Sequence, residues 1–166
     1  MHIRTIRYND AEPLMNLIRE VEAESPYMLY GAGERKPNLK KQKEMIDRIL
    51  KTDNSTVLVA ELNSSLAGYA MAIGGSSPRN QHSVHLVIGM LSIHQGKGLG
   101  TQLLEELEKW AVENKLHRLE LTVVSKNYSA IALYEKMGFI REGTKQDSLY
   151  IDGQLFDEYY MAKILA

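Results

Sequence analysis

The sequence contains no cysteine. Disulfides, thiolate metal sites and cysteine nucleophiles all require that residue, so these three kinds of chemistry are excluded. Long apolar runs are also missing, since no window approaches the ~18 apolar residues of a membrane-spanning helix. The first ten residues, MHIRTIRYND, hold no apolar stretch followed by a small-residue cleavage site. We therefore expect no membrane association and a cytoplasmic location.

An excess of charge of one sign is absent as well. Lys and Arg number 20 against 21 Asp and Glu, for a formal net charge of -1. This balance gives no long-range positive field, so nucleic acid is not expected as a ligand. His2, His94 and His117 show no metal-ligand spacing with one another or with carboxylates, and we expect no metal site. The 166 residues suit one domain over 1–166, because a chain of this length buries roughly 70% of its unfolded surface.

Hydrophobic periodicity predicts alternating strands and helices. The expected strands are residues 1–8, 56–62, 66–73, 84–93 and 118–124, with two more from residue 139 onward around a turn at Asp152 and Gly153. Helical stripes lie at Leu14, Leu17, Ile18 and Val21; at Met45, Ile46, Ile49 and Leu50; and at Leu99, Leu103, Leu107, Trp110 and Ala111, with a fourth helix over 127–137. The central strand, helix and strand predict a parallel pair joined by a right-handed crossover. The fold class is α/β, a mixed sheet of about seven strands flanked by about four helices.

A glycine-rich segment, Gln-Gly-Lys-Gly-Leu-Gly at 95–100, lies between an expected strand and helix. Free backbone N–H groups and the positive end of the helix dipole at such a point form an anion site. The dinucleotide motif would need glycine where Thr101 stands, and the P-loop would need Ser or Thr after Lys97, where Gly98 stands. Neither nucleotide motif is therefore supported. The alternative is a glycine turn that only packs a helix against a sheet.

A second motif, which contains two polar residues, follows about thirty residues later in the run NYSAIALYEKMGF. Asn127 and Tyr134 are seven residues apart, which places them within about 20° on one helix face. Both side chains could therefore contact the same ligand. The alternative is an ordinary amphipathic helix in which Tyr134 is half buried and Asn127 is only an N-cap.

With these two motifs the sequence resembles the GNAT acetyltransferases. Residues 95–100 fit the family's acyl-coenzyme A motif, Gln/Arg-x-x-Gly-x-Gly/Ala, and the resemblance continues at Asn127, Ala130, Leu133, Tyr134, Gly138 and Phe139. It covers about residues 56–140, and the ends match in element order only. The resemblance implies acetyl-CoA as co-substrate and a V-shaped splay between the fourth and fifth strands that receives the pantetheine arm.

The resemblance also implies roles for individual residues. Main-chain groups of Ile88, Gly89 and Met90 would bind the pantetheine amides and the acetyl oxygen. The pyrophosphate would lie over Gln95, Gly96, Lys97, Gly98, Leu99 and Gly100. Asn127 would bind the coenzyme or brace the loop before its helix. Tyr134 would be the general acid, since a phenol of ordinary pKa near 10 is protonated at neutral pH.

The general base is left open by the sequence. Many family members have a glutamate on the fourth strand or early in the fifth, whereas this fourth strand has none and Thr122 stands where some members carry it. The candidates are His82, whose ordinary pKa of about 6.5 suits a base, Glu120, which shares a strand face with Thr122, and His85. Deprotonation through a water chain, with no dedicated base, is equally compatible.

The leading hypothesis is an N-acetyltransferase that moves an acetyl group to a primary amine on a small molecule, a peptide N-terminus or a lysine. A catalytically silent acyl-coenzyme A sensor is the alternative, and a nucleotide-binding protein is the third hypothesis. The acceptor pocket is expected from the loop at 25–37 and the final hairpin at 145–160, which hold tyrosines and acids. A homodimer is a further expectation, because the resemblance implies pairing through C-terminal strands and the apolar C-terminal strand here could lie at a sheet edge.

Overall fold

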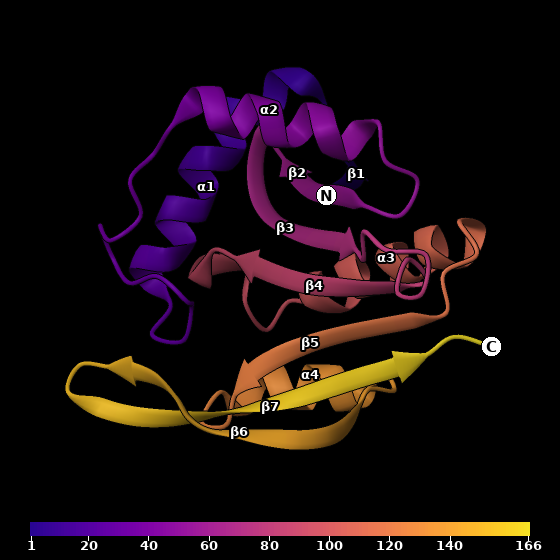
Figure 1. Cartoon of the computed structure of the whole chain (residues 1–166). Coiled ribbons are helices and arrows are strands. Elements are labelled where there is room, and N and C mark those ends of the chain that lie inside the picture. The colour runs from indigo at the N-terminus through magenta and orange to yellow at the C-terminus, as the bar shows by residue number, and fades with distance from the viewer.

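The computed structural model describes all residues, 1–166, as an α/β fold (Figure 1). Its strands are β1 (His2–Thr5), β2 (Thr56–Leu62), β3 (Ser65–Gly74), β4 (Ser83–Met90), β5 (Arg118–Val124), β6 (Ile140–Ile151) and β7 (Gln154–Ile164). Its helices are α1 (Ala11–Glu24), α2 (Leu39–Leu50), α3 (Leu99–Glu113) and α4 (Tyr128–Lys136), with short 3-10 turns η1 (Tyr8–Asp10) and η2 (Ser92–His94). The predicted elements are confirmed in number, type and order.

One seven-stranded sheet runs in the order β1-β2-β3-β4-β5-β7-β6. All neighbouring strands are antiparallel except β4 and β5. That parallel pair is joined through α3, as the predicted crossover requires. The mixed sheet of the predicted fold class is thereby confirmed.

Helices cover both faces of the sheet, with α1 and α2 on one side and α3 and α4 on the other (Figure 1). Each face has its own apolar core. Leu14, Ile18 and Val21 of α1 pack with Ile46 of α2 on the first face, and Leu103 and Leu107 of α3 pack with strand residues on the second. The stripes predicted from periodicity make these contacts, with the exception of Leu50 at the end of α2, which is exposed.

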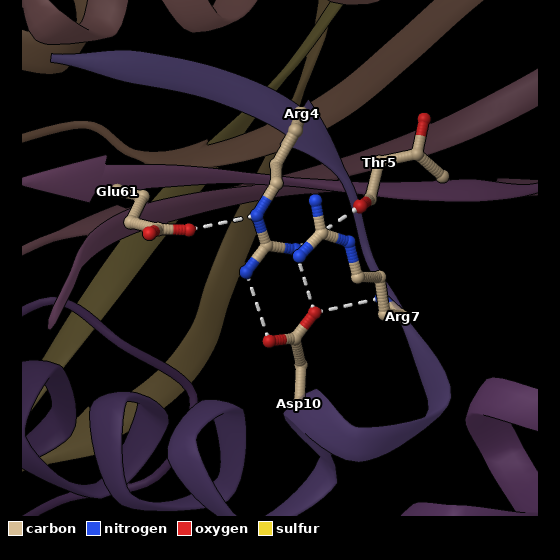
Figure 2. A network of polar contacts seen from close by, with 5 residues as sticks. All are labelled: Arg4, Thr5, Arg7, Asp10 and Glu61. Carbon is tan, nitrogen blue, oxygen red and sulfur yellow. Dashed lines mark hydrogen bonds and ion pairs between the residues drawn. The ribbon is translucent and has the colours of Figure 1, made fainter. Parts of the chain in front are cut away.

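A network of ion pairs ties the first strand to the start of α1 and to β2 (Figure 2). The Arg4 guanidinium donates to both carboxylate oxygens of Asp10, at 2.7 and 2.9 Å, and its Nε donates to Glu61 at 2.8 Å. The backbone N–H of Arg7 also donates to Asp10, at 2.7 Å. These hydrogen bonds, that of Arg4 first, lower the pKa of Asp10. Arg4, Asp10 and Glu61 are therefore paired with one another.

Three local expectations are corrected by the structure. The first strand ends at Thr5 and the fourth at Met90, because 3-10 turns follow soon after each. The C-terminal strand is not at an edge: β7 lies between β5 and β6, so β6 is the edge strand. The edge position of the C-terminal strand therefore no longer supports a dimer. None of the four helices has both the length and the apolar composition of a membrane-spanning segment.

Candidate active site

The two parallel strands diverge in the middle of the sheet. β4 and β5 pair only at their first residues, and the last pair is His85 with Glu120. β4 continues to Met90 while it pairs with β3 alone. The edge of β4 from Leu86 to Met90 that faces β5 therefore has no strand partner. Its N–H and C=O groups are free to bind an extended ligand, as an edge strand does.

The glycine loop opens directly beyond this divergence. Gly96 and Gly98 have φ of +74° and +84°, values in the left-handed region that glycine adopts without strain. The N–H groups from Gly96 to Thr101 donate to no backbone acceptor, and α3 begins at Leu99 without a side-chain cap. Consecutive free amides at a helix N-terminus form an anion site.

Gly100 has a different role from that of Gly98. A Cβ at Gly100 would lie 2.7 Å from Cδ2 of Leu133 and 3.1 Å from Cε of Met90, whereas a Cβ at Gly98 would meet nothing within 4 Å. Gly100 therefore lets α3 pack against α4 and the end of β4. This contact brings the glycine loop, the splayed strand and the helix of Tyr134 together.

Tyr134 is buried on the inner side of α4, where 9% of its surface is exposed. Its ring packs against Phe139 at 5.8 Å between centroids, and its hydroxyl donates to no protein group while retaining some exposure. Burial raises the pKa of Tyr134 to about 12, because the phenolate would lose its hydration. The hydroxyl is therefore protonated at neutral pH and able to donate.

Asn127 is the N-cap of α4. Its side-chain oxygen accepts from the backbone N–H of Ala130, at 3.4 Å. This is the bracing arrangement expected as one of its two roles. Its side-chain amide nitrogen has no hydrogen-bond partner in the protein.

The candidate bases do not gather at the open end of the splay. His82 precedes β4, and its ring lies 6.3 Å from that of His117; seven residues of strand, roughly 23 Å, separate it from Gly89. Glu120 accepts from Arg118 at 2.9 Å, and Arg118 also pairs with Glu142. His85 lies beside Glu120 at the last β4–β5 pair. Thr122 lies further along β5, opposite Tyr160 of β7.

The two segments expected to form the acceptor pocket meet in the structure. Tyr27, in the loop after α1, makes an edge-to-face contact with Phe156 of β7, at 6.4 Å between ring centroids. Glu158 is on the same face of β7 as Phe156, and it accepts from Ser148 at 2.9 Å. The loop and the hairpin together border one side of the site.

Three polar residues beside the splay were not found by sequence reasoning. Glu22 of α1 is buried, and both its carboxylate oxygens accept from Nε of Arg35, at 3.1 and 3.0 Å. Tyr69 of β3 is 1% exposed and lies opposite Gly89. These residues come from three separate segments, so no short motif could have joined them. The one local signal was a glutamate near the apolar stripe of α1.

Comparison with known proteins shows the family of this chain. The sequence matches the Acetyltransferase (GNAT) family over residues 17–139. The chain belongs to the GNAT family. It is an acyltransferase that uses acetyl-CoA as co-substrate, as GNAT acetyltransferases do. The family resemblance stated from the sequence is thereby confirmed.

Individual GNAT relatives are similar over much or all of the chain. The L-amino acid N-acetyltransferase AaaT of Escherichia coli (strain K12) is 31% identical over 111 residues, 64% of this chain and 67% of that protein. A GNAT acetyltransferase from Streptococcus pneumoniae matches with a TM-score of 0.95 and 29% identity over 99% of both chains. The fold is also that of yncA from Salmonella typhimurium, solved with its cofactor acetyl-CoA, at a TM-score of 0.89, 22% identity, and coverage of 100% of this chain and 94% of that one.

Proposed function

We propose that this enzyme transfers the acetyl group of acetyl-CoA directly to a primary amine, with Tyr134 as the general acid. The observation that carries the proposal is the set of free amides from Gly96 to Thr101 at the open end of the β4–β5 splay, next to an unpaired buried phenol. The pyrophosphate would bind these amides, and the pantetheine arm would pair with the free edge of β4 at Ile88, Gly89 and Met90. Lys97 adds a positive charge at the loop.

The transfer requires a neutral amine, a polarised thioester carbonyl and a protonated leaving group. The amine nitrogen forms a bond to the carbonyl carbon, and the carbon–sulfur bond then breaks. Tyr134 donates its proton to the departing sulfur and regains a proton from the nitrogen through solvent. The products are an acetamide and coenzyme A with its thiol, so protons and electrons balance.

Replacing Tyr134 with Phe tests the general acid. This change removes one hydroxyl and keeps the ring that packs on Phe139. General acid catalysis contributes about a hundredfold to ten-thousandfold, so kcat should fall by that factor while the Kd for acetyl-CoA stays nearly the same. Thiol release measures the first quantity and calorimetry the second. The control is Tyr128→Phe, on the same helix but 70% exposed.

Full kcat in the Tyr134→Phe variant, with chemistry rate-limiting, would contradict the acid role. The acceptors for this assay come from a panel of L-amino acids, peptides with free N-termini and diamines. If the wild-type protein binds acetyl-CoA tightly and acetylates none of them, the proposed transfer to a primary amine is contradicted. The relative AaaT is named for acetylation of L-amino acids, which makes amino acids the first part of the panel to test.

A further inference from the structure

Tyr69 lies directly across the splayed strand. It is paired in register with Gly89, and a Cβ at Gly89 would lie 2.6 to 2.7 Å from Cε1, Cζ and the hydroxyl oxygen of Tyr69. Only glycine at position 89 leaves room for this ring. The hydroxyl of Tyr69 is therefore held against the backbone of the strand expected to bind the acetyl group.

The hydroxyl of Tyr69 has no hydrogen-bond partner in the protein, although the residue is 1% exposed. The only side-chain nitrogen or oxygen that is both fully buried and unpaired is Nε2 of Gln42. The Tyr69 oxygen therefore keeps some contact with open space. An unpaired hydroxyl in a buried position is destabilising unless something bonds to it, so this group is available to a ligand.

Tyr69 and Tyr134 approach the splay from opposite faces of the sheet. Tyr69 belongs to the core under α1 and α2, and Tyr134 to the core under α3 and α4. Burial is the main reason that the pKa of Tyr69 is raised, and Tyr134 adds slightly to this rise. A thioester in the splay would thus have one phenol beside its leaving sulfur and the other on the face that an incoming amine can approach.

An ion pair between buried Glu22 and exposed Arg35 lies on the same face as Tyr69. Glu22 directly follows Val21, which packs in the same core as Tyr69, and Arg35 is hydrogen-bonded to Glu22. The charge of Glu22 accordingly raises the pKa of Tyr69 further, and that of Arg35 lowers it. Arg35 uses only its Nε on Glu22, and its guanidinium stacks on Tyr30 at 4.2 Å. Its two terminal nitrogens donate to no protein group. Arg35 also lines a hollow of about 370 Å³ between α1 and the loop after it, together with Arg19, Glu20 and Glu22.

We propose that Tyr69, Glu22 and Arg35 form the acceptor subsite, and that it takes a small zwitterion whose amino group and carboxylate are a few atoms apart, as in an α-amino acid. The Tyr69 oxygen accepts a hydrogen bond from the amine and directs the nitrogen lone pair toward the thioester. Glu22 favours arrival of the cationic amine, and the free nitrogens of Arg35 bind the carboxylate. Diamines and lysine side chains lack the anionic partner that Arg35 requires. This inference rests on the proposed acetyl transfer.

Matched pairs of acceptors test the subsite. Each pair consists of an amino acid and the amine that lacks its carboxylate, such as L-phenylalanine and phenethylamine. In the wild-type enzyme we expect kcat/KM to be at least about tenfold higher for the amino acid, because a charge-assisted hydrogen bond is lost with the carboxylate. Arg35→Gln should bring this ratio close to one, mainly by raising the KM of the amino acid. The double variant Glu22→Gln with Arg35→Gln should do the same without leaving an unpaired buried carboxylate.

Tyr69→Phe tests the contact with the amine. This variant should lower kcat/KM at least about tenfold for both members of a pair, with an unchanged Kd for acetyl-CoA and an unchanged preference for the carboxylate. Tyr8→Phe, at an exposed position on η1, is the control and should behave as wild type. Thermal unfolding of every variant confirms that it is folded.

The outcomes separate this inference from the proposed function. If the wild-type enzyme acetylates phenethylamine as well as L-phenylalanine, or if the Arg35 variants keep the preference, the subsite is wrong and acetyl transfer stands. Normal turnover by Tyr69→Phe would likewise overturn the role of Tyr69. If no amine of either kind is acetylated, the proposed function fails and the subsite fails with it.

Discussion

The two buried tyrosines, Tyr69 and Tyr134, are positioned at the β4–β5 splay by different elements. Tyr134 comes from α4 with a hydroxyl that burial keeps protonated, and Tyr69 comes from β3 because Gly89 leaves space for its ring. In both cases the polar atom is at the end of a side chain whose ring is packed into an apolar core. A rigid ring positions its hydroxyl with little loss of conformational entropy, as preorganised catalytic groups require.

The pH dependence of turnover should show that Tyr134 stays protonated. Its pKa is raised to about 12, so the acid form persists well above neutral pH. We expect kcat/KM to rise as the acceptor amine loses its proton and to show no descending limb below about pH 11. Initial rates in buffers of constant ionic strength measure this. A descending limb near pH 8 to 9 that disappears in Tyr134→Phe would show that the phenol titrates with a much lower pKa.

At the scale of elements, residues 98–100 at the start of α3 must both expose backbone amides and allow close helix packing. Gly98 adopts a left-handed φ so that the loop can turn its amides outward, and Gly100 lets the helix approach α4. The first requirement serves ligand binding and the second serves packing. Substitutions at the two glycines should therefore have different consequences.

Gly98→Asp should remain folded and lose acetyl-CoA binding, because its carboxylate would repel the pyrophosphate and its Cβ meets no neighbour. The left-handed conformation should cost about 1–2 kcal/mol of stability. Gly100→Ala should instead destabilise the protein by about 1–3 kcal/mol through overpacking against Leu133. Denaturant unfolding and calorimetry with acetyl-CoA distinguish the two. Unchanged affinity in folded Gly98→Asp would rule out this loop as the pyrophosphate site.

At the scale of the whole molecule, stability should depend on pH at both ends of the range. Asp10 has a lowered pKa because Arg4 stabilises its carboxylate. Its contribution is complete above its ordinary pKa and is lost as pH falls below about 4. Tyr134 has a raised pKa, so its contribution is complete below pH 10 and is lost as pH rises toward about 12.

We therefore expect the free energy of unfolding to fall in acid and again in alkali. The rise in the pKa of Tyr134 from 10.0 to about 12 corresponds to a loss of about 3 kcal/mol above that range. Urea unfolding as a function of pH measures both limbs. Asp10→Asn should flatten the acid limb and Tyr134→Phe should reduce the alkaline one, with Tyr69 supplying the remainder. An alkaline limb identical in Tyr134→Phe would contradict the assignment.

The sequence determined the order of elements, the mixed sheet and the glycine loop. Apolar spacing is local, so the stripe at Leu103 and Leu107 could be identified as a buried face without a partner being known. Tyr134 and Asn127 could also be identified from the sequence, because Tyr134 lies on α4 and Asn127 is the N-cap of that helix. Strand ends were less certain, because the turns after Thr5 and Met90 continue the apolar run.

Only the tertiary structure decided which polar groups meet at the splay. Glu22, Arg35 and Tyr69 are distant in sequence, and their contacts follow from how α1 and the loop after it pack on β3. The candidate bases His82 and Glu120 were equally plausible from the chain, but strand register places them near the end where β4 and β5 are still paired. Register and packing are set by the whole sheet. A local pattern can specify a residue's face but not what lies across from it.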